Sequence, residues 1–230
     1  MGPSSNHESS SGGAAPTVPL SVLVAPEVEH VCHRLESLVQ RHGFVLCGGT
    51  ALGTYLGHRK SNDLDFFRSD GFDEQALINE IRGSGISAHL LKSGIESQQL
   101  LLDLEGAKVE FVAWRGLDTT RLRQISGSGL VVPELDQLAI MKIRAAATRG
   151  KKRDIVDLYF LLMHGFDPAA LVLAAADEQR PVATKFAKAI SLFDRRNGYD
   201  ASEQLHMIRQ VDLQEMASVV KRAFAGAVFL

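Results

Sequence analysis

The sequence predicts an α+β protein in which an α/β lobe precedes a helical lobe. In the first half of the chain, short apolar runs alternate with glycine-containing turns, a pattern typical of strands and their connections. After Pro133, apolar residues recur at helical spacing almost to the C-terminus. The first residues are mostly Ser, Gly, Pro and Asn, which bury too little apolar surface to offset the entropy of ordering. We therefore expect a disordered tail at 1–20, the α/β lobe at 21–130 and the helical lobe at 131–230.

The individual elements follow from local patterns. Apolar residues on one face predict a helix that begins at Pro26 and ends at Gly43, because glycine commonly terminates helices. The strands of the α/β lobe are expected at 44–47, 63–67, 86–91, 98–104 and 108–114, and its further helices at 50–57 and 72–82. The helices of the second lobe are expected at 134–149, 152–164, 168–177 and 182–195, followed by a last pair after Ala201.

Bulk composition limits the classes of function. The chain of 230 residues is 45% hydrophobic and 23% charged and has a net charge of −2, which is typical of a globular domain. This balance does not indicate a nucleic-acid-binding domain, but a local basic groove is compatible with it. Cys32 and Cys47 lack the spacing of a disulfide framework or a zinc site, which favours a reducing cytoplasm. No run reaches the roughly 18 apolar residues of a membrane span, and no signal-peptide pattern is present, so we expect neither membrane insertion nor secretion.

Two aspartates alternate with apolar residues in the expected strand 63–67. Asp63 and Asp65 therefore project from the same face of the strand. Two carboxylates so close repel each other, and oxygen ligands of this kind suit Mg²⁺ or Mn²⁺, which also bind substrate phosphates. An exposed strand edge would explain the pattern equally well when it is taken alone.

The run Gly48-Gly49-Thr50 lies between an expected strand and an expected helix. Glycines allow backbone to approach a ligand closely, and free N–H groups at such a turn can bind phosphate. The same residues can also serve only to make a sharp turn. Together with Asp63 and Asp65, they supply the two halves of a nucleotide–metal site.

A third carboxylate is needed if two metal ions are to be held at the roughly 3.5–4 Å separation common in such sites. Glu110 is the favoured candidate, because it interrupts an apolar strand in which a charge must face a site or solvent. Asp103 has the same property in the preceding strand and remains the alternative.

Charged residues also lie on apolar helix faces in the second lobe. Lys142 shares a face with leucines and alanines, and Asp154 shares one with Leu158 and Leu161. Lys142 either extends to solvent along its stem or meets triphosphate or Asp154. One interpretation of Asp154 is an acidic residue in the first turn of its helix, where the helix dipole favours negative charge. Alternatively, Asp154 or Asp157 orients a basic group or activates the hydroxyl group of an acceptor substrate.

Two basic runs lie near these candidates in sequence. One consists of Arg59 and Lys60, and the other of Arg149, Lys151, Lys152 and Arg153. Such runs are commonly solvated turns. If both border one cleft, they form a cationic rim for triphosphate or an RNA acceptor.

Three stretches together resemble the nucleotidyltransferase-like AbiEii/AbiGii toxin family, of type IV toxin–antitoxin systems. The first stretch comprises LCGGTAL at 46–52 and GHRKSNDLDFF at 57–67; the second is Lys142 with its following alanines; the third is RDIVDLY at 153–159. The resemblance spans roughly 46–162. It implies a polymerase-β-like nucleotidyltransferase fold, in which a mixed sheet with flanking helices precedes a C-terminal helical bundle and Glu110 takes the place of the third carboxylate.

The resemblance also implies a function and a set of site residues. We expect a metal-dependent nucleotidyltransferase that moves a nucleoside monophosphate from an NTP onto an acceptor hydroxyl of RNA or tRNA, acting as the toxin of a toxin–antitoxin or abortive-infection system with a cognate antitoxin. Alternatives are a small-molecule nucleotidyltransferase and a non-catalytic nucleotide-binding module. The catalytic residues are expected to be Asp63, Asp65, Glu110, Lys142 and Asp154, of which the first three would bind Mg²⁺ or Mn²⁺. The NTP-binding residues are expected to be Gly48, Gly49, Thr50, Arg59, Ser61 and Lys142.

Overall fold

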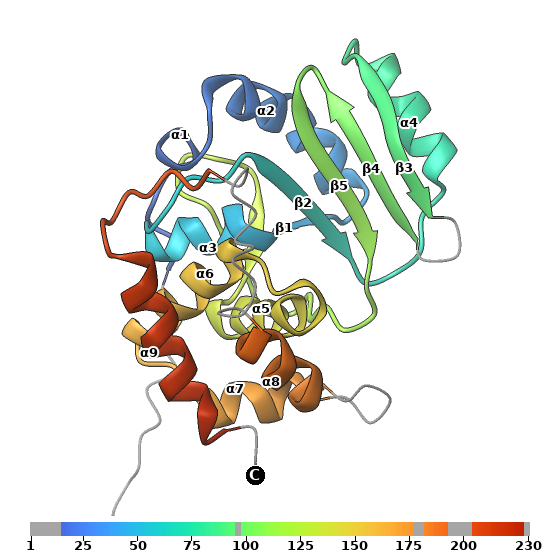
Figure 1. Cartoon of the computed structure of the whole chain (residues 1–230). Helices are drawn as coiled ribbons and strands as arrows, with labels where there is room; N and C mark the ends of the chain where they lie inside the picture. Colours follow the sequence, from blue (N-terminus) through green and yellow to red (C-terminus); the bar gives the residue numbers. More distant parts are fainter. Residues whose placement is uncertain (1–14, 95–97, 177–181, 193–203, 228–230) are drawn as a thin grey trace, which may run out of the picture.

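A five-stranded mixed sheet forms the centre of the first lobe in the computed structural model, which describes residues 15–94, 98–176, 182–192 and 204–227. The strands are β1 (Val45–Cys47), β2 (Asp63–Arg68), β3 (Ala88–Gly94), β4 (Gln99–Leu104) and β5 (Ala107–Ala113), arranged in the order β1-β2-β5-β4-β3. β2 and β5 are parallel, and the other neighbours are antiparallel (Figure 1). The five expected strands are therefore confirmed, with ends that differ by a few residues.

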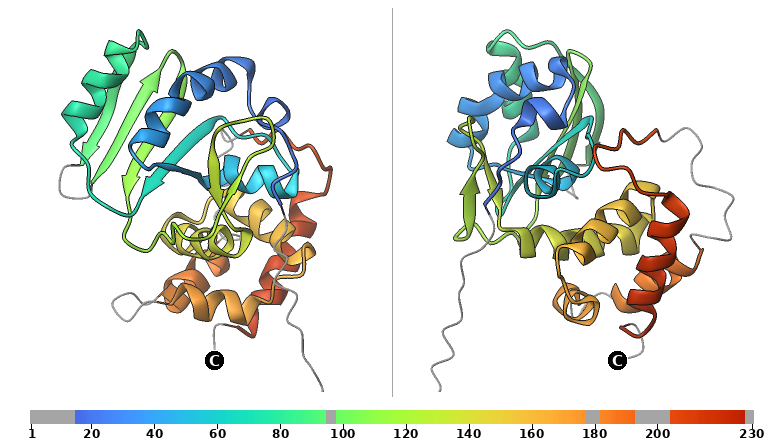
Figure 2. Two further views of the ribbon diagram at one scale, coloured as in Figure 1. Left: turned by 180° about the vertical axis from the view of Figure 1, so that it is seen from behind. Right: turned by 90° about the vertical axis from the view of Figure 1, so that its left-hand side faces the viewer.

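The two faces of this sheet have different roles. Side chains of β2, β4 and β5 alternate between buried and partly exposed, as expected for strands with one covered face. The covered face packs against α2 (Pro26–Arg41) and α4 (Glu74–Gly83), which lie on the same side of the sheet (Figure 2). Asp63, Asp65 and Glu110 belong to the alternate set of positions and project from the other face.

Short elements complete the first lobe. α3 (Gly48–Leu56) follows β1 directly, and a second sheet pairs β6 (Leu122–Gln124) with β7 (Val131–Pro133). Neither of these two strands, nor the four-residue α1 (Leu20–Leu23), is predicted from the sequence. Each is too short to show a recognisable hydrophobic period.

The expected N-terminal tail ends earlier than predicted. Residues 1–14 lie outside the described residues. The next segment packs on α3, because the Val18 amide donates to the Thr54 carbonyl at 2.9 Å and the side chain of Leu20 is buried. Residues from about 16 onwards therefore belong to the folded lobe.

The second lobe is helical, as predicted. It comprises α5 (Leu135–Arg149), α6 (Lys152–Met163), α7 (Pro168–Ala175), α8 (Val182–Leu192) and α9 (Leu213–Ala225), with α5 packed against α6, α7 and α8, and α6 packed against α9. Residues 177 and 193–195, expected as helix ends, are outside the described part. No helix within the described ranges is long and apolar enough to span a lipid bilayer.

The expected pair of helices after Ala201 is a single helix where the chain is described. α9 is preceded by an extended segment, 204–212, which crosses the first lobe. The Lys60 amide donates to the His206 carbonyl at 2.8 Å, and the amides of Ile208 and Arg209 donate to the His58 carbonyl. These backbone bonds use the polar groups of the segment and fasten α9 to the strand-bearing lobe.

Candidate active site

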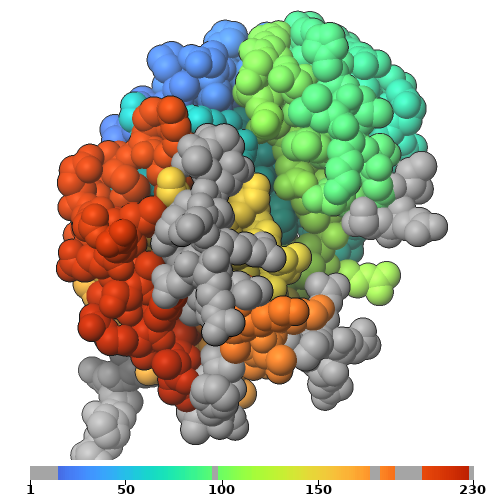
Figure 3. Space-filling view, in the orientation of Figure 1, coloured from blue at the N-terminus to red at the C-terminus, as the bar shows by residue number. Residues whose placement is uncertain are grey.

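A polar cavity of about 640 Å³ lies where the sheet, the α5–α6 junction and segment 204–206 meet. Its lining residues include seven Lys or Arg and three Asp or Glu side chains, in a chain whose net charge is −2. In Figure 3 the yellow α5–α6 region is visible between the green and teal sheet residues and the orange-red C-terminal segment. The cavity therefore concentrates positive charge around a small acidic patch.

The acidic wall of the cavity is built by two parallel strands. Asp63 and Asp65 stand on β2, and Glu110 on β5 is the register partner of Asp65. Burial, and then the charges of Glu110 and Asp63, raise the pKa of the Asp65 carboxyl to about 6. The neighbouring cations only partly offset this repulsion, so the wall has an excess of negative charge.

Glu110 and Asp103 differ in position. Glu110 lines the cavity and accepts a hydrogen bond from the side-chain amide of Gln99. Asp103 lies one strand further from β2, opposite Lys108, and its Oδ1 accepts from the Gly106 amide at 2.9 Å in the β4–β5 turn. The geometry favours Glu110 as the third carboxylate, because Asp103 serves the turn and stands outside the cavity lining.

The diglycine turn is packed tightly against the acidic wall. Gly48 has φ +66°, and a Cβ placed there would overlap the Asp65 carboxylate. A Cβ at Gly49 would lie 2.6 Å from Arg59 Nη2, and Gly49 lines the cavity beside Ser61. The buried Thr50 hydroxyl donates to the Asp63 carbonyl at 2.7 Å and so positions the start of β2.

Replacing Gly48 with Ala is expected to lower transfer activity at least about 100-fold, because the new methyl group displaces the Asp65 carboxylate and a positive φ is strained in any L-residue. Activity and thermal melting of the variant should be compared with those of Gly83→Ala. Gly83 ends α4, and apart from its own helix backbone and chain neighbours nothing lies within 4 Å of the position that a methyl group would take there, so that substitution should stabilise slightly or have no effect. Equal activity in the two variants would contradict the packing role of Gly48.

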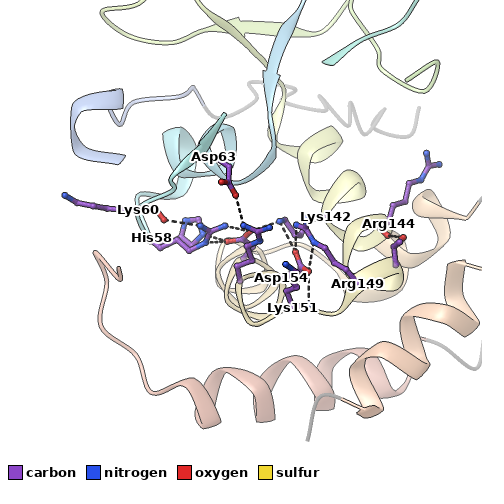
Figure 4. A network of polar contacts seen from close by, with 12 residues as sticks. His58, Lys60, Asp63, Lys142, Arg144, Arg149, Lys151 and Asp154 are labelled. Atoms are coloured by element: carbon purple, nitrogen blue, oxygen red, sulfur yellow. Dashed lines mark hydrogen bonds and ion pairs between the residues drawn. The ribbon is translucent and has the colours of Figure 1, made fainter. Parts of the chain in front are cut away.

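The opposite wall rests on a buried network of charges (Figure 4). Asp157 accepts from Arg59 at 2.7 and 2.9 Å and contacts His58 Nε2 and Lys142 Nζ, each at 2.7 Å. Although burial opposes ionisation, Arg59 and Lys142 hold the pKa of the Asp157 carboxyl well below its ordinary value. The guanidinium of Arg59 is therefore aimed by Asp157 towards the diglycine turn.

Asp154 is the second anion of this network. It lies 3.3 Å from Lys142 Nζ and accepts from Arg149 Nη2 at 2.9 Å and from the Lys151 amide at 3.0 Å. Burial opposes its ionisation, but Lys142 and Arg149 lower the pKa of its carboxyl. Lys142 thus contacts both Asp154 and Asp157, and both anions orient basic groups. Asp154 also accepts from the backbone amide at the start of α6, so two of the alternatives considered for it from the sequence hold together.

His58 is a member of the network that sequence reasoning missed. Its side chain is fully buried, and desolvation lowers its pKa despite the nearby Asp157. A histidine in the polar run before Asp63 was a visible signal, but its partner is 99 residues away. Only the tertiary fold brings α6 beneath this turn.

One cation reaches the acidic wall directly. Arg153 Nη1 donates to Asp63 Oδ2 at 2.8 Å, linking the start of α6 to the start of β2. The expected basic runs therefore do border one cavity. Arg59, Arg149 and Arg153 line it together with Lys60 and Lys151.

The acidic wall suits a divalent cation by its donor chemistry. The three carboxylates supply only oxygen, as Mg²⁺ and Mn²⁺ prefer. Burial first, and then the charges of Glu110 and Asp63, raise the pKa of the Asp65 carboxyl, and a bound cation would offset both effects. Within the described residues, no three acidic, histidine or cysteine side chains converge as a preformed metal cage. Asp63 is engaged by Arg153 and Glu110 by Gln99, so these side chains would have to turn to bind a metal together.

The Asp65 titration predicts an unusual pH dependence of stability in metal-free protein. Its pKa of about 6 exceeds the ordinary 3.8, so the folded state holds this proton more tightly than the unfolded chain. Stability from this group is present below about pH 4 and is lost as pH rises through about 6. Asp65→Asn removes the titration, and the free energy of unfolding of the variant relative to wild type should rise by about 1–2 kcal/mol from about pH 4 to 7. Urea unfolding with a chelator measures this difference; a constant value would contradict the prediction.

Comparisons with known proteins agree with this architecture. The family model described as nucleotidyl transferase AbiEii toxin, type IV TA system, matches residues 33–224. An uncharacterised protein of Aquifex aeolicus is 32% identical over 144 residues, which cover 61% of this chain and 68% of that protein. The crystal structure of JHP933 from Helicobacter pylori is similar with a TM-score of 0.55 at 19% identity, over 87% of this chain and 91% of that one, a likeness that shows a shared fold.

Proposed function

The chain belongs to the AbiEii family of nucleotidyl transferase toxins, and from this membership we propose that it uses a divalent metal to move a nucleoside monophosphate from an NTP onto a hydroxyl of RNA. The membership confirms the predicted family, fold class and nucleotidyltransferase activity. It also implies an NTP substrate and a cognate antitoxin, as expected of a type IV toxin–antitoxin system. Metal dependence and the RNA acceptor are the proposed steps.

The observation that carries the proposal is the pairing of two oppositely charged walls in one cavity. Asp63, Asp65 and Glu110 face basic side chains that include Arg59, Arg149 and Arg153. A triphosphate carries several negative charges and accepts hydrogen bonds from such groups. An acidic wall would repel it unless cations lie between, and this arrangement therefore fits a metal–nucleotide complex.

Asp63, Asp65 and Glu110 would hold Mg²⁺ or Mn²⁺, which when bound favours ionisation of an attacking hydroxyl and neutralises charge on phosphates. The acceptor oxygen bonds to the α-phosphorus as the bond to the β-phosphate oxygen breaks, and pyrophosphate leaves. The backbone at Gly49 and the guanidinium of Arg59, which lie beside each other in the cavity, would bind the leaving phosphates. Because Asp157 fixes Arg59 and Asp154 fixes Arg149, these donors are positioned before the nucleotide arrives.

Labelled transfer tests the proposal directly. The protein is incubated with each α-³²P-NTP, Mg²⁺ and bulk tRNA, and the products are separated on a denaturing gel. Label on tRNA with wild type, and none with a chelator or with Asp65→Ala, supports metal-dependent transfer to RNA. Label with the chelator present would exclude metal dependence, and pyrophosphate release with metabolite pools but not with RNA would favour a small-molecule acceptor.

Three exposed lysines favour RNA over a small acceptor. Lys60, Lys108 and Lys151 line the cavity and reach solvent, and Figure 4 shows Lys60 pointing away from the buried network. Such a rim could follow a polynucleotide backbone beyond the reacting hydroxyl, whereas a small acceptor has no need of it.

Replacing these three lysines with Ala is expected to weaken RNA binding about 10- to 100-fold. The slope of log Kd against the logarithm of salt concentration should also fall by about 2, because each single-stranded phosphate contact releases about 0.7 counterions. Affinity for a non-hydrolysable NTP should change much less. Lys92→Ala, on the exposed strand β3, provides a control for charge removed elsewhere. RNA affinity that the triple substitution leaves unchanged would favour a small-molecule acceptor.

A further inference from the structure

Arg153 occupies one oxygen of a carboxylate on the acidic wall. It is the second residue of α6, and its Nη1 lies 2.8 Å from Asp63 Oδ2 on the opposite lobe. Given the proposed function, on which this inference rests, we propose that Arg153 takes the place of a metal at Asp63 until nucleotide arrives, and then moves to the triphosphate. Arg153 is thus a positioning residue that makes metal and nucleotide bind together.

The other cations of the cavity are held differently. Arg59 is bound by Asp157, and Lys142 and Arg149 by Asp154, two carboxylates that are fully buried. Arg153 instead pairs with a carboxylate that faces the cavity, and the two side chains remain 26% and 34% exposed. Removing the partner of a fully buried carboxylate costs much free energy, whereas Asp63 is partly open to solvent, so the Arg153–Asp63 pair can be exchanged at lower cost than the pairs of Asp154 and Asp157.

The exchange follows from competition for one group. Arg153 Nη1 already uses one lone pair of Asp63 Oδ2, and a guanidinium and a metal ion bound to the same carboxylate would repel each other. When Arg153 leaves, Asp63, Asp65 and Glu110 remain as three neighbouring anions, which then require a cation. A triphosphate that attracts Arg153 therefore raises the affinity of Asp63 for metal, and linkage requires the metal to raise nucleotide affinity equally.

Arg153→Ala tests the exchange without a catalytic readout. Free Mn²⁺ is titrated by electron paramagnetic resonance into the full chain without nucleotide, and binding of an α,β-imido NTP analogue is measured by calorimetry with saturating Mg²⁺. Removing Arg153 should tighten Mn²⁺ binding about three- to tenfold, because the competitor is gone, and weaken analogue binding about tenfold, because a triphosphate contact is lost. Lys151→Ala removes one charge from the same cavity without touching Asp63, and should change Mn²⁺ affinity less than twofold.

Three results would overturn the inference. In the first, Arg153→Ala binds Mn²⁺ no more tightly than wild type, while Asp63→Asn binds it more weakly than wild type. Asp63 then binds the ion, but Arg153 does not compete with it. An equal gain in Lys151→Ala means that general electrostatics explains the effect. In the third, Asp63→Asn binds Mn²⁺ as tightly as wild type, which would exclude Asp63 itself as a metal ligand. Arg153→Gln removes the charge but keeps a polar side chain, and it gives the same comparison if the alanine variant does not fold.

Discussion

Replacing Asp65 with Asn is expected to lower the rate of nucleotidyl transfer by about a thousandfold or more while the protein stays folded. Asp65 lies at the centre of the acidic wall, between Asp63 on its own strand and Glu110 on the next. Loss of one preorganised charge in such a site commonly raises the barrier by about 3–4 kcal/mol. Asparagine keeps the shape and removes a repelled charge, so the melting temperature should be unchanged or higher.

Asp103→Asn is the matched control for this prediction. Asp103 is also a carboxylate in a central strand, but it serves the β4–β5 turn through the Gly106 amide and does not line the cavity. Its substitution should change the rate less than about threefold, since no transition-state contact is lost. A thousandfold loss in Asp103→Asn, with an active Glu110→Gln, would assign the third carboxylate to Asp103.

The acidic wall could be predicted from sequence because its geometry is local. Alternation along a strand places Asp63 and Asp65 on one face whatever the rest of the fold does. The same holds for Gly48, because a turn of two glycines between a strand and a helix requires no distant information. The position of Glu110 beside Asp65 depends also on the parallel pairing of β2 with β5, and the pattern within a single strand does not predict which strands pair.

The basic wall of the cavity, formed by Arg59, Lys142, Arg149 and Arg153, could be predicted only from charged residues at unexpected positions. Lys142 and Asp154 interrupt apolar helix faces, and both side chains are buried, so the alternative in which Lys142 extends to solvent is wrong. Their partners could not be identified, because Asp157 meets His58 and Arg59 across almost 100 residues of chain. The Arg153–Asp63 pair was missed for the same reason, since basic turns are commonly solvated and only the tertiary fold brings the start of α6 next to the start of β2.

This division has a physical consequence for the two walls. Burial of Asp65 and its repulsion by Glu110 and Asp63 disfavour the ionised carboxylate, so the acidic wall reduces stability at neutral pH. On the basic side, the cations Arg59 and Lys142 are buried with the anions Asp154 and Asp157. These opposite charges attract one another, so they stabilise the fold as well as the site. Substitutions should separate these roles. Substitution of Asp65 should lower activity without lowering stability, whereas substitution of Asp157 should lower stability.

Asp157→Asn is therefore expected to lower the free energy of unfolding by about 3–5 kcal/mol, the cost of leaving buried charges without their partner. Asp157 neutralises Arg59 and Lys142 and accepts from His58, and its side chain is fully buried. Because these cations hold the pKa of its carboxyl well below the ordinary value, its contribution is complete above about pH 4 and is lost as pH falls, opposite to Asp65.

Urea unfolding at neutral pH measures this loss, with Asp136→Asn as the control for removing an ion pair. Asp136 pairs with Arg121 at 2.9 Å on the surface, where both side chains are about half exposed, and its substitution should leave the unfolding midpoint unchanged within error. If Asp157→Asn cost no more than Asp136→Asn, Asp157 would not be the residue that joins the lobes. With the expected loss, the network that aims Arg59 at the cavity is also the one that holds α6 against the sheet-bearing lobe, so the basic wall cannot be dismantled without loosening the fold.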